Sequence, residues 1–222
     1  MEAKGKRDFR WEVRSQDKNK VPKMEELFKQ MWKVYDDYIR LEKPDLPFWS
    51  TEWNLVGHMA VAASKLGPVT LEYSEKKPRG KRTRRPDAWF RMSMKPNDTR
   101  DLLIEAKRVE LSLHQDSKFI SGKIKPSFQS CKSYLGRFDD CSWRSPMIFL
   151  QPYIPSSSTT EAVYDQAVEK FIRSCGQALK QSSGGGKNSF YAYYFLEWSA
   201  LVKSEKYYYP GVAIFGDLQK VK

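Results

Sequence analysis

The sequence predicts an α/β (α+β) protein in which a mixed central sheet is flanked by helices. Apolar residues recur at helical spacing in four segments: 24–39, Ser50 or Thr51 to about Leu66, 128–138 and 161–181. Short strand-like runs occur in six others: 69–73, 89–94, 102–107, 147–153, 190–198 and 207–215. The resulting order, ααβββαβαββ, is typical of one sheet with helices packed against it.

The ends of the first two helices can be predicted from individual residues. Pro44 and Pro47 follow the first helix, and proline cannot continue a helix. Ser50 or Thr51 can cap the start of the second helix, and Gly67-Pro68 is a typical end. Residues 1–20 are polar and charged without periodicity, so we expect a basic, loosely held arm before a single domain at 21–222.

Composition excludes several classes of protein. Hydrophobic residues make up 40% of the 222 residues, enough to build a core. No apolar run approaches the ~20 residues of a membrane-spanning helix, and the first residues do not resemble a secretory signal. Three unevenly spaced cysteines fit a reducing compartment and give no zinc-binding pattern. We therefore expect a cytoplasmic protein.

The charge balance points to an anionic partner. Lys and Arg outnumber Asp and Glu by 39 to 27, which gives a net charge of +12 and a pI near 9.5. Nucleic acid is the commonest intracellular polyanion, although a solubilising surface or an anionic membrane contact would also fit. Five basic residues stand directly before Pro86-Asp87 and are candidate nucleic-acid contacts: Arg79, Lys81, Arg82, Arg84 and Arg85.

Two acidic residues and a lysine form the candidate catalytic set. Glu105 and Lys107 are two apart on a predicted strand, so their side chains share one face, while Ile104 and Ala106 point to the other. A turn near Asn97-Asp98 would bring Asp87 opposite the end of this strand. Carboxylate oxygens suit Mg²⁺ or Mn²⁺, which can activate a water, and Lys107 could stabilise charge developing on a phosphate.

Glu52 is a further candidate metal ligand. It lies in the first turn of the second helix, in line with the apolar stripe Val56, Met59 and Ala63, so it can point towards the sheet. The alternative is an acid that only complements the dipole at the helix N-terminus.

Pro86-Asp87, followed by Glu105-Ala106-Lys107 on an apolar strand, resembles the signature of the PD-(D/E)xK, or restriction-endonuclease-like, nuclease superfamily. The resemblance covers about residues 50–153 and implies an αβββαβ core, with 155–222 as an extension of one helix and two strands. It implies Mg²⁺-dependent cleavage of DNA, with Asp87, Glu105 and Glu52 as metal ligands and Lys107 assisting the attacking water. Double-strand cleavage would fit a homodimer.

The resemblance is incomplete, and other interpretations remain open. Some branches of the superfamily carry Gln-x-x-x-Tyr on the next helix. Here Tyr134 is one residue too far from Gln129, and Gln129 and Lys132 are kept only as candidate nucleic-acid contacts. The tyrosines at 191, 193, 194 and 207–209 could stack on bases, although packing is the commoner role. The alternative function is a catalytically inactive nucleic-acid-binding or regulatory module on the same fold.

Overall fold

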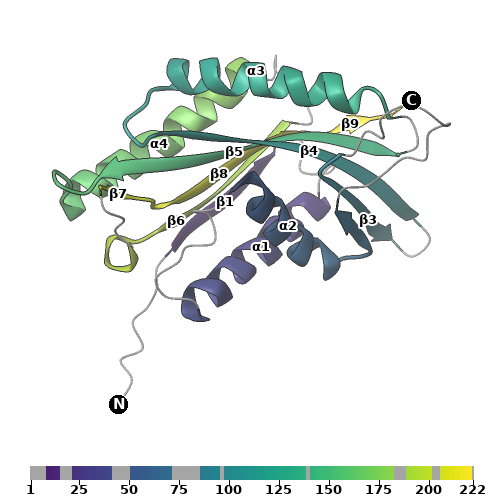
Figure 1. Ribbon diagram of the computed structural model, residues 1–222, viewed down its shortest axis with the longest axis horizontal. Coiled ribbons are helices and arrows are strands. Elements are labelled where there is room, and N and C mark those ends of the chain that lie inside the picture. Colours follow the sequence, from purple (N-terminus) through teal and green to yellow (C-terminus); the bar gives the residue numbers. More distant parts are fainter. Residues whose placement is uncertain are drawn as a thin grey trace.

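The structure is a computed structural model that describes residues 9–15, 22–41, 51–71, 86–95, 98–138, 141–182, 189–201 and 206–221. One mixed sheet lies between two layers of helices (Figure 1). Helices α1 (Pro22–Leu41) and α2 (Glu52–Ser64) cover one face, and α3 (Ser117–Leu135) and α4 (Glu161–Ser182) cover the other. The prediction of a mixed central sheet flanked by helices is therefore confirmed.

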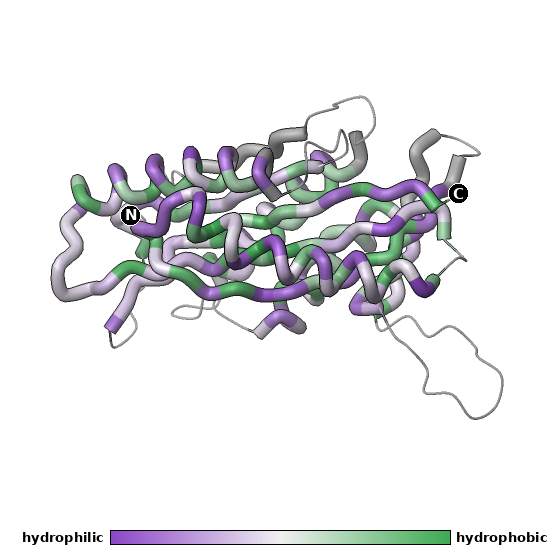
Figure 2. Tube along the Cα trace, turned by 90° about the horizontal axis from the view of Figure 1, so that it is seen from above, coloured by the Kyte–Doolittle hydropathy of each residue, from purple (hydrophilic) through white to green (hydrophobic). Residues whose placement is uncertain are grey.

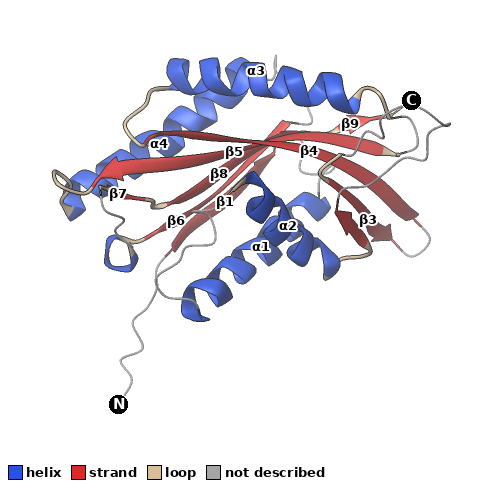
Figure 3. Cartoon of the chain, viewed as in Figure 1, coloured by secondary structure: helices blue, strands red, loops and turns tan. Residues whose placement is uncertain are grey.

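The sheet has the strand order β1-β6-β8-β5-β4-β3-β2, and β7 and β9 also pair with β5 (Figure 3). The strands are β1 Phe9–Ser15, β2 Val69–Leu71, β3 Ala88–Lys95, β4 Asp98–Ser112, β5 Trp143–Pro155, β6 Ser189–Leu196, β7 Tyr207–Tyr208, β8 Gly211–Asp217 and β9 Gln219–Lys220. β4 and β5 are parallel, whereas the other pairs are antiparallel. Parallel neighbours need a crossover connection, and α3 lies in that connection.

Separate cores lie on the two faces of the sheet. Met147 and Phe149 of β5 pack with α1 and α2, whereas the alternate residues Ile148 and Leu150 pack with α3 and α4. Because both faces are covered, β5 and β6 read as continuous apolar runs without alternation. Along the helices, hydrophilic and hydrophobic residues alternate within each turn, as expected when one side of a helix is buried (Figure 2).

Strand β1 was not predicted. Phe9–Ser15 lie inside the segment that we expected to be a loose arm, yet they pair antiparallel with β6 at the edge of the sheet. A short strand with a distant partner leaves little local signal, because its backbone hydrogen bonds are made with residues far along the chain. The rest of the predicted arm, residues 1–8 and 16–20, lies outside the described residues.

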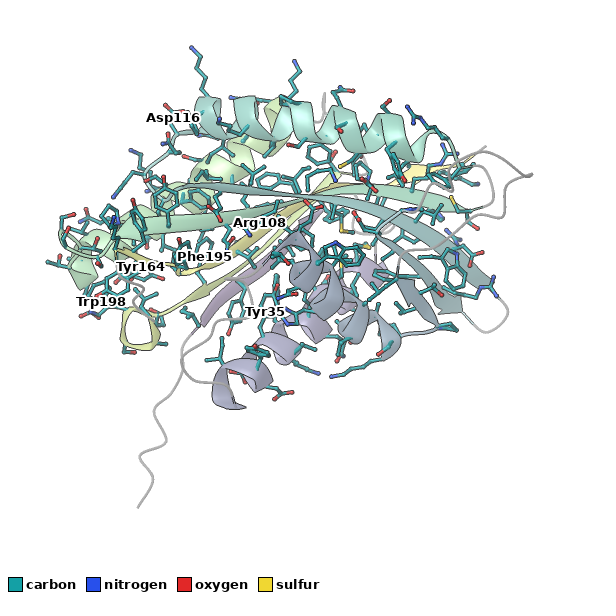
Figure 4. All side chains as sticks on the ribbon, in the orientation of Figure 1. Tyr35, Arg108, Asp116, Tyr164, Phe195 and Trp198 are labelled. Atoms are coloured by element: carbon teal, nitrogen blue, oxygen red, sulfur yellow. The ribbon has the colours of Figure 1, made fainter. Side chains whose placement is uncertain are left out.

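The strands predicted at 102–107 and 147–153 are longer in the structure, and three further predicted elements had wrong boundaries. Helix α3 begins at Ser117 and not at 128. The side chain of Asp116 caps this end of the helix by accepting a hydrogen bond from the Phe119 amide at 2.8 Å. Asp116 is labelled at that end of α3 in Figure 4. The predicted strand at 190–198 ends at Leu196 and is followed by a 3-10 turn at Trp198–Ala200. The predicted strand at 207–215 is divided at Tyr209-Pro210, because proline has no amide for a ladder.

We predict that Gly211→Ala destabilises the protein, whereas Gly176→Ala stabilises it slightly. An added Cβ at Gly211 would overlap the Tyr194 carbonyl oxygen and lie 2.9 Å from the Phe195 Cα, both backbone atoms that cannot move aside cheaply. Overpacking of this kind costs about 1–3 kcal/mol. A Cβ at Gly176 meets no atom within 4 Å in α4, where alanine is favoured by about 1 kcal/mol. Urea unfolding measures both changes; equal stability of the two variants would contradict the close approach of β6 and β8.

Candidate active site

The candidate site lies where strand β3 leaves strand β4. The antiparallel pairing of these strands ends at Ala88 and Ile104, although β4 continues to Ser112. Beyond that point, no other described strand pairs with this edge of β4. Asp87 directly precedes β3, and Glu52 begins α2, so both acids stand beside the exposed end of the ladder.

The carboxylates of Asp87 and Glu52 take the place of the missing strand. Asp87 Oδ2 accepts a hydrogen bond from the Ala106 amide at 2.6 Å, and Glu52 Oε2 accepts one from the Arg108 amide at 2.8 Å. Amides two residues apart point to the same edge of a strand, which is why both acids meet β4 from one side. Arg108 is labelled on β4 in Figure 4.

Lys107 draws two of the acids together. Its Nζ lies 3.2 Å from Glu105 Oε1, 3.4 Å from Glu52 Oε1 and 2.9 Å from the Ala106 carbonyl oxygen. Ile104 and Ala106 belong to the core on the α1 and α2 side, so the predicted alternation of this strand is confirmed. Three acidic side chains and one ammonium therefore gather around residues 105–108 of β4.

Glu105 is the electrostatically unusual member of this group. Burial, and after it the charges of Asp87 and Glu52, raise the pKa of Glu105 to about 7, although Lys107 opposes the shift. Its Oε2 is buried and has no hydrogen-bond partner among the described residues. A buried carboxylate oxygen without a partner is costly, so the site favours either a proton or a cation at this position.

Lys107 remains an ammonium at neutral pH. Burial by itself lowers its pKa, but the carboxylates of Glu105 and Glu52 outweigh this effect and raise the pKa above its usual value. The side chain is also 37% exposed, so water contributes to its solvation. Lys107 can therefore donate hydrogen bonds and offset negative charge, but it is poorly suited to accept a proton.

Helix α3 covers the site from the other side of the sheet edge. Cys131 is buried on this helix, and burial together with the negative charge of Glu105 raises the pKa of its thiol to about 12. A thiol with this pKa is protonated at neutral pH and is a poor metal ligand or nucleophile. Cys131 was not predicted to lie near the site, because only the packing of α3 on β4 brings it there.

The oxygen donors suit a hard divalent cation, but they are not arranged as a finished metal site. Within the described residues, no three Asp, Glu, His or Cys side chains form a ready-made group for a metal ion. Asp87 and Glu52 instead direct oxygens to backbone amides, and Lys107 stands among the carboxylates. The buried Glu105 Oε2 is a carboxylate oxygen, which is the donor type that Mg²⁺ and Mn²⁺ prefer.

Within the described part of the chain, the structure does not bring the predicted nucleic-acid contacts together with the acids and Lys107. The basic residues Arg79, Lys81, Arg82, Arg84 and Arg85 lie outside the described residues. Gln129 is exposed on α3. Lys132 is turned to β8, where its Nζ lies 2.8 Å from Asp217 Oδ2. The tyrosines at 191, 193 and 194 are buried in the two cores, which supports packing as their role.

Comparisons with known proteins give no relative. No family model, no curated protein and no solved structure matches the chain. None of the described helices is long and apolar enough to cross a membrane. A function can therefore be inferred only from the arrangement of the residues at the β4 edge.

We predict that Glu105→Gln removes a pH dependence of stability that the unaltered protein shows. A folded-state pKa of about 7, against an ordinary value of 4.5, means that the folded state binds more protons than the unfolded state between these values. The stability of the unaltered protein should therefore fall as pH rises through this window, by about 3 kcal/mol at ~1.4 kcal/mol per pKa unit. Lys107 stays charged throughout the window and adds no slope.

Urea unfolding without divalent cations at about pH 5 and about pH 8 measures this difference. Glu161→Gln, at the exposed start of α4, is the matched control and should keep the slope of the unaltered protein. Parallel stability profiles for the Glu105→Gln variant and the unaltered protein would show that Glu105 does not hold a proton in the fold.

Proposed function

We propose that the protein is a metal-dependent nuclease of the PD-(D/E)xK type that hydrolyses phosphodiester bonds in DNA. The observation that carries this proposal is the convergence of Asp87, Glu105, Glu52 and Lys107 at the open edge of β4. The order α2, β2, β3, β4, α3, β5 agrees with the αβββαβ core of that superfamily and supports the proposal.

Asp87 and Glu105, with Glu52 as an auxiliary ligand, would hold Mg²⁺ or Mn²⁺. The bound ion would lower the pKa of a water and offset charge on the phosphate oxygens. In this arrangement Glu105 must give up its proton, because only the carboxylate binds the ion well. A pKa of about 7 makes that loss easy near neutral pH.

Lys107 would act as a hydrogen-bond donor and a positive charge during hydrolysis. Negative charge grows on the phosphorus oxygens as water attacks, and a fixed ammonium in a partly buried position stabilises it more than the ground state. Its contacts with Glu105, Glu52 and the Ala106 carbonyl oxygen hold the ammonium in place before substrate arrives. Preorganisation of this kind removes a reorganisation cost from the transition state.

A module that only binds nucleic acid gains nothing from this cluster. Three carboxylates stand against one ammonium, so the fully ionised site would repel phosphate. A divalent cation reverses the sign of that field and makes the cluster useful. The charges therefore favour hydrolysis over the alternative of an inactive binding module.

We predict that cleavage of DNA requires Mg²⁺ or Mn²⁺ and both Asp87 and Lys107. Asp87→Asn can still accept the hydrogen bond from Ala106 but loses its charge, so it should fold normally and cleave at least ~100-fold more slowly. Lys107→Met keeps the chain length without the ammonium and should lose about 100- to 1000-fold. Supercoiled, linear and single-stranded DNA are incubated with each ion or with EDTA, and the products are separated on gels.

Asp101→Asn is the matched control, since Asp101 is paired with Arg91 at 2.8 Å on the same hairpin but lies away from the site. Full activity of Asp101→Asn with loss in Asp87→Asn supports the proposal. Metal-independent cleavage, or full activity after Glu105→Ala, would mean that the site has been mislocated. DNA binding without cleavage under any metal would support the inactive module.

We also predict that Mg²⁺ or Mn²⁺ binds the free protein and raises its Tm. At a free ion concentration of ~100 times Kd, binding would add about 2.7 kcal/mol to the free energy of unfolding. The shift should disappear in Glu105→Gln and persist in Asp101→Asn. Calorimetric titration near pH 7 should detect proton release in the unaltered protein and in Asp101→Asn but not in Glu105→Gln, because Glu105 must ionise to bind. An equal Tm shift in the Glu105→Gln variant would place the ion elsewhere.

A further inference from the structure

Helix α3 differs from the other described helices in its charge. It carries four lysines (118, 123, 125 and 132) and no acid, a net charge of +4. In α1, four basic residues balance four acids, and in α4 three balance three. Helix α2 has one acid and no basic residue. Among the described helices, α3 is therefore the one with a net positive charge.

The charges of α3 lie on its outer face. Phe119 is exposed, but five apolar residues of the helix are buried against the sheet and α4: Ile120, Ile124, Phe128, Cys131 and Leu135. Lys118, Lys123 and Lys125 are exposed, as is Arg137 just beyond the helix. None of these three lysines forms an ion pair with another residue in the described part of the chain. Lys132 is the exception, because Asp217 neutralises it.

The outer face of α3 also permits close approach of a polymer backbone. Four exposed residues between and beyond the lysines have little or no side chain: Gly122, Ser130, Ser133 and Gly136. The ammonium of Lys123 lies 5.4 Å from the centre of the Phe119 ring, which holds it near the surface. Short side chains flanked by fixed positive charges suit contacts with phosphate oxygens.

One flank of α3 faces the side of β4 that carries the candidate site. Tyr134 packs in a small cluster with Leu103 of β4 and Phe138. Lys123, Ser127 and Ser130 precede Tyr134 by eleven, seven and four residues, so they lie on the same side of the helix. Lys123 stands about 12 Å along the axis from Cys131, roughly three to four base-pair steps of a duplex.

We propose that the exposed face of α3 binds the phosphate backbone of a nucleic-acid duplex and directs it across the β4 edge. This inference rests on the proposed function and names a surface that delivers its substrate. An acidic site needs such a surface, because Asp87, Glu105 and Glu52 attract no phosphate by themselves. A membrane surface fits less well, since an interfacial helix inserts its apolar face, and here that face is buried against the sheet.

The test compares two double variants that remove equal charge. Lys123→Ala with Lys125→Ala alters the proposed surface, and Lys170→Ala with Arg173→Ala removes two exposed charges from α4. Affinity for a short fluorescent DNA duplex is measured by anisotropy over a range of salt concentrations in EDTA, where no cleavage occurs. Lysine and arginine to alanine changes favour helix formation, so both variants should fold, which circular dichroism verifies.

The α3 variant should bind duplex about 10- to 100-fold more weakly near 0.1 M salt, and the slope of log affinity against log salt should fall by about 1.8, or ~0.9 per phosphate contact. The α4 variant should bind like the unaltered protein. An unchanged α3 variant, or equal losses in both variants, overturns the inference. The inference is also overturned if the α3 variant keeps its affinity for duplex but loses affinity for another polyanion, namely polyglutamate or vesicles of anionic phospholipid.

The two proposals fail separately. If the α3 variant loses duplex binding and the unaltered protein cleaves no DNA with any metal, the binding surface on α3 is supported and the nuclease function is contradicted. If Asp87→Asn abolishes cleavage while the α3 variant binds normally, the nuclease function stands and the substrate must approach by another surface.

Discussion

The fold depends on how the edge of β4 is completed after β3 ends. Backbone amides in a buried sheet need acceptors, and leaving one unsatisfied costs about as much as losing a hydrogen bond. Asp87 and Glu52 supply those acceptors for Ala106 and Arg108. The same two contacts fix the start of β3 and the first turn of α2 against β4, so a structural requirement brings acidic side chains together at one place.

That arrangement has an electrostatic consequence. Lys107 offsets only part of the charge of Glu52, Asp87 and Glu105, and Glu105 is the most buried of these acids. Its pKa rises to about 7, and its Oε2 lacks a partner among the described residues. The site is therefore strained in the free protein and is relieved by a proton or a cation. Helix α3 carries the opposite charge, so the proposed attraction of a polyanion and the proposed chemistry on it belong to different elements.

Local sequence predicted the main elements because their signals are local. The apolar spacing in 24–39 and 161–181 depends on neighbours one turn away, and both helices form as expected. The positions of Glu105 and Lys107 on one side of their strand also followed from simple alternation. The start of α3 was misplaced because Pro126 sits within the helix, where packing of Ile120 and Ile124 against the second core outweighs the cost of proline.

Local patterns were enough to predict a mixed sheet between helices, with two acids and a lysine close to one strand. The groups that those side chains contact could not be predicted in this way. Asp87 and Glu52 each reach a backbone amide, and Lys132 is bound by Asp217 from β8 and not by the site. The reason is that periodicity reports which face a side chain occupies, whereas its partners are set by elements that come together from distant parts of the chain.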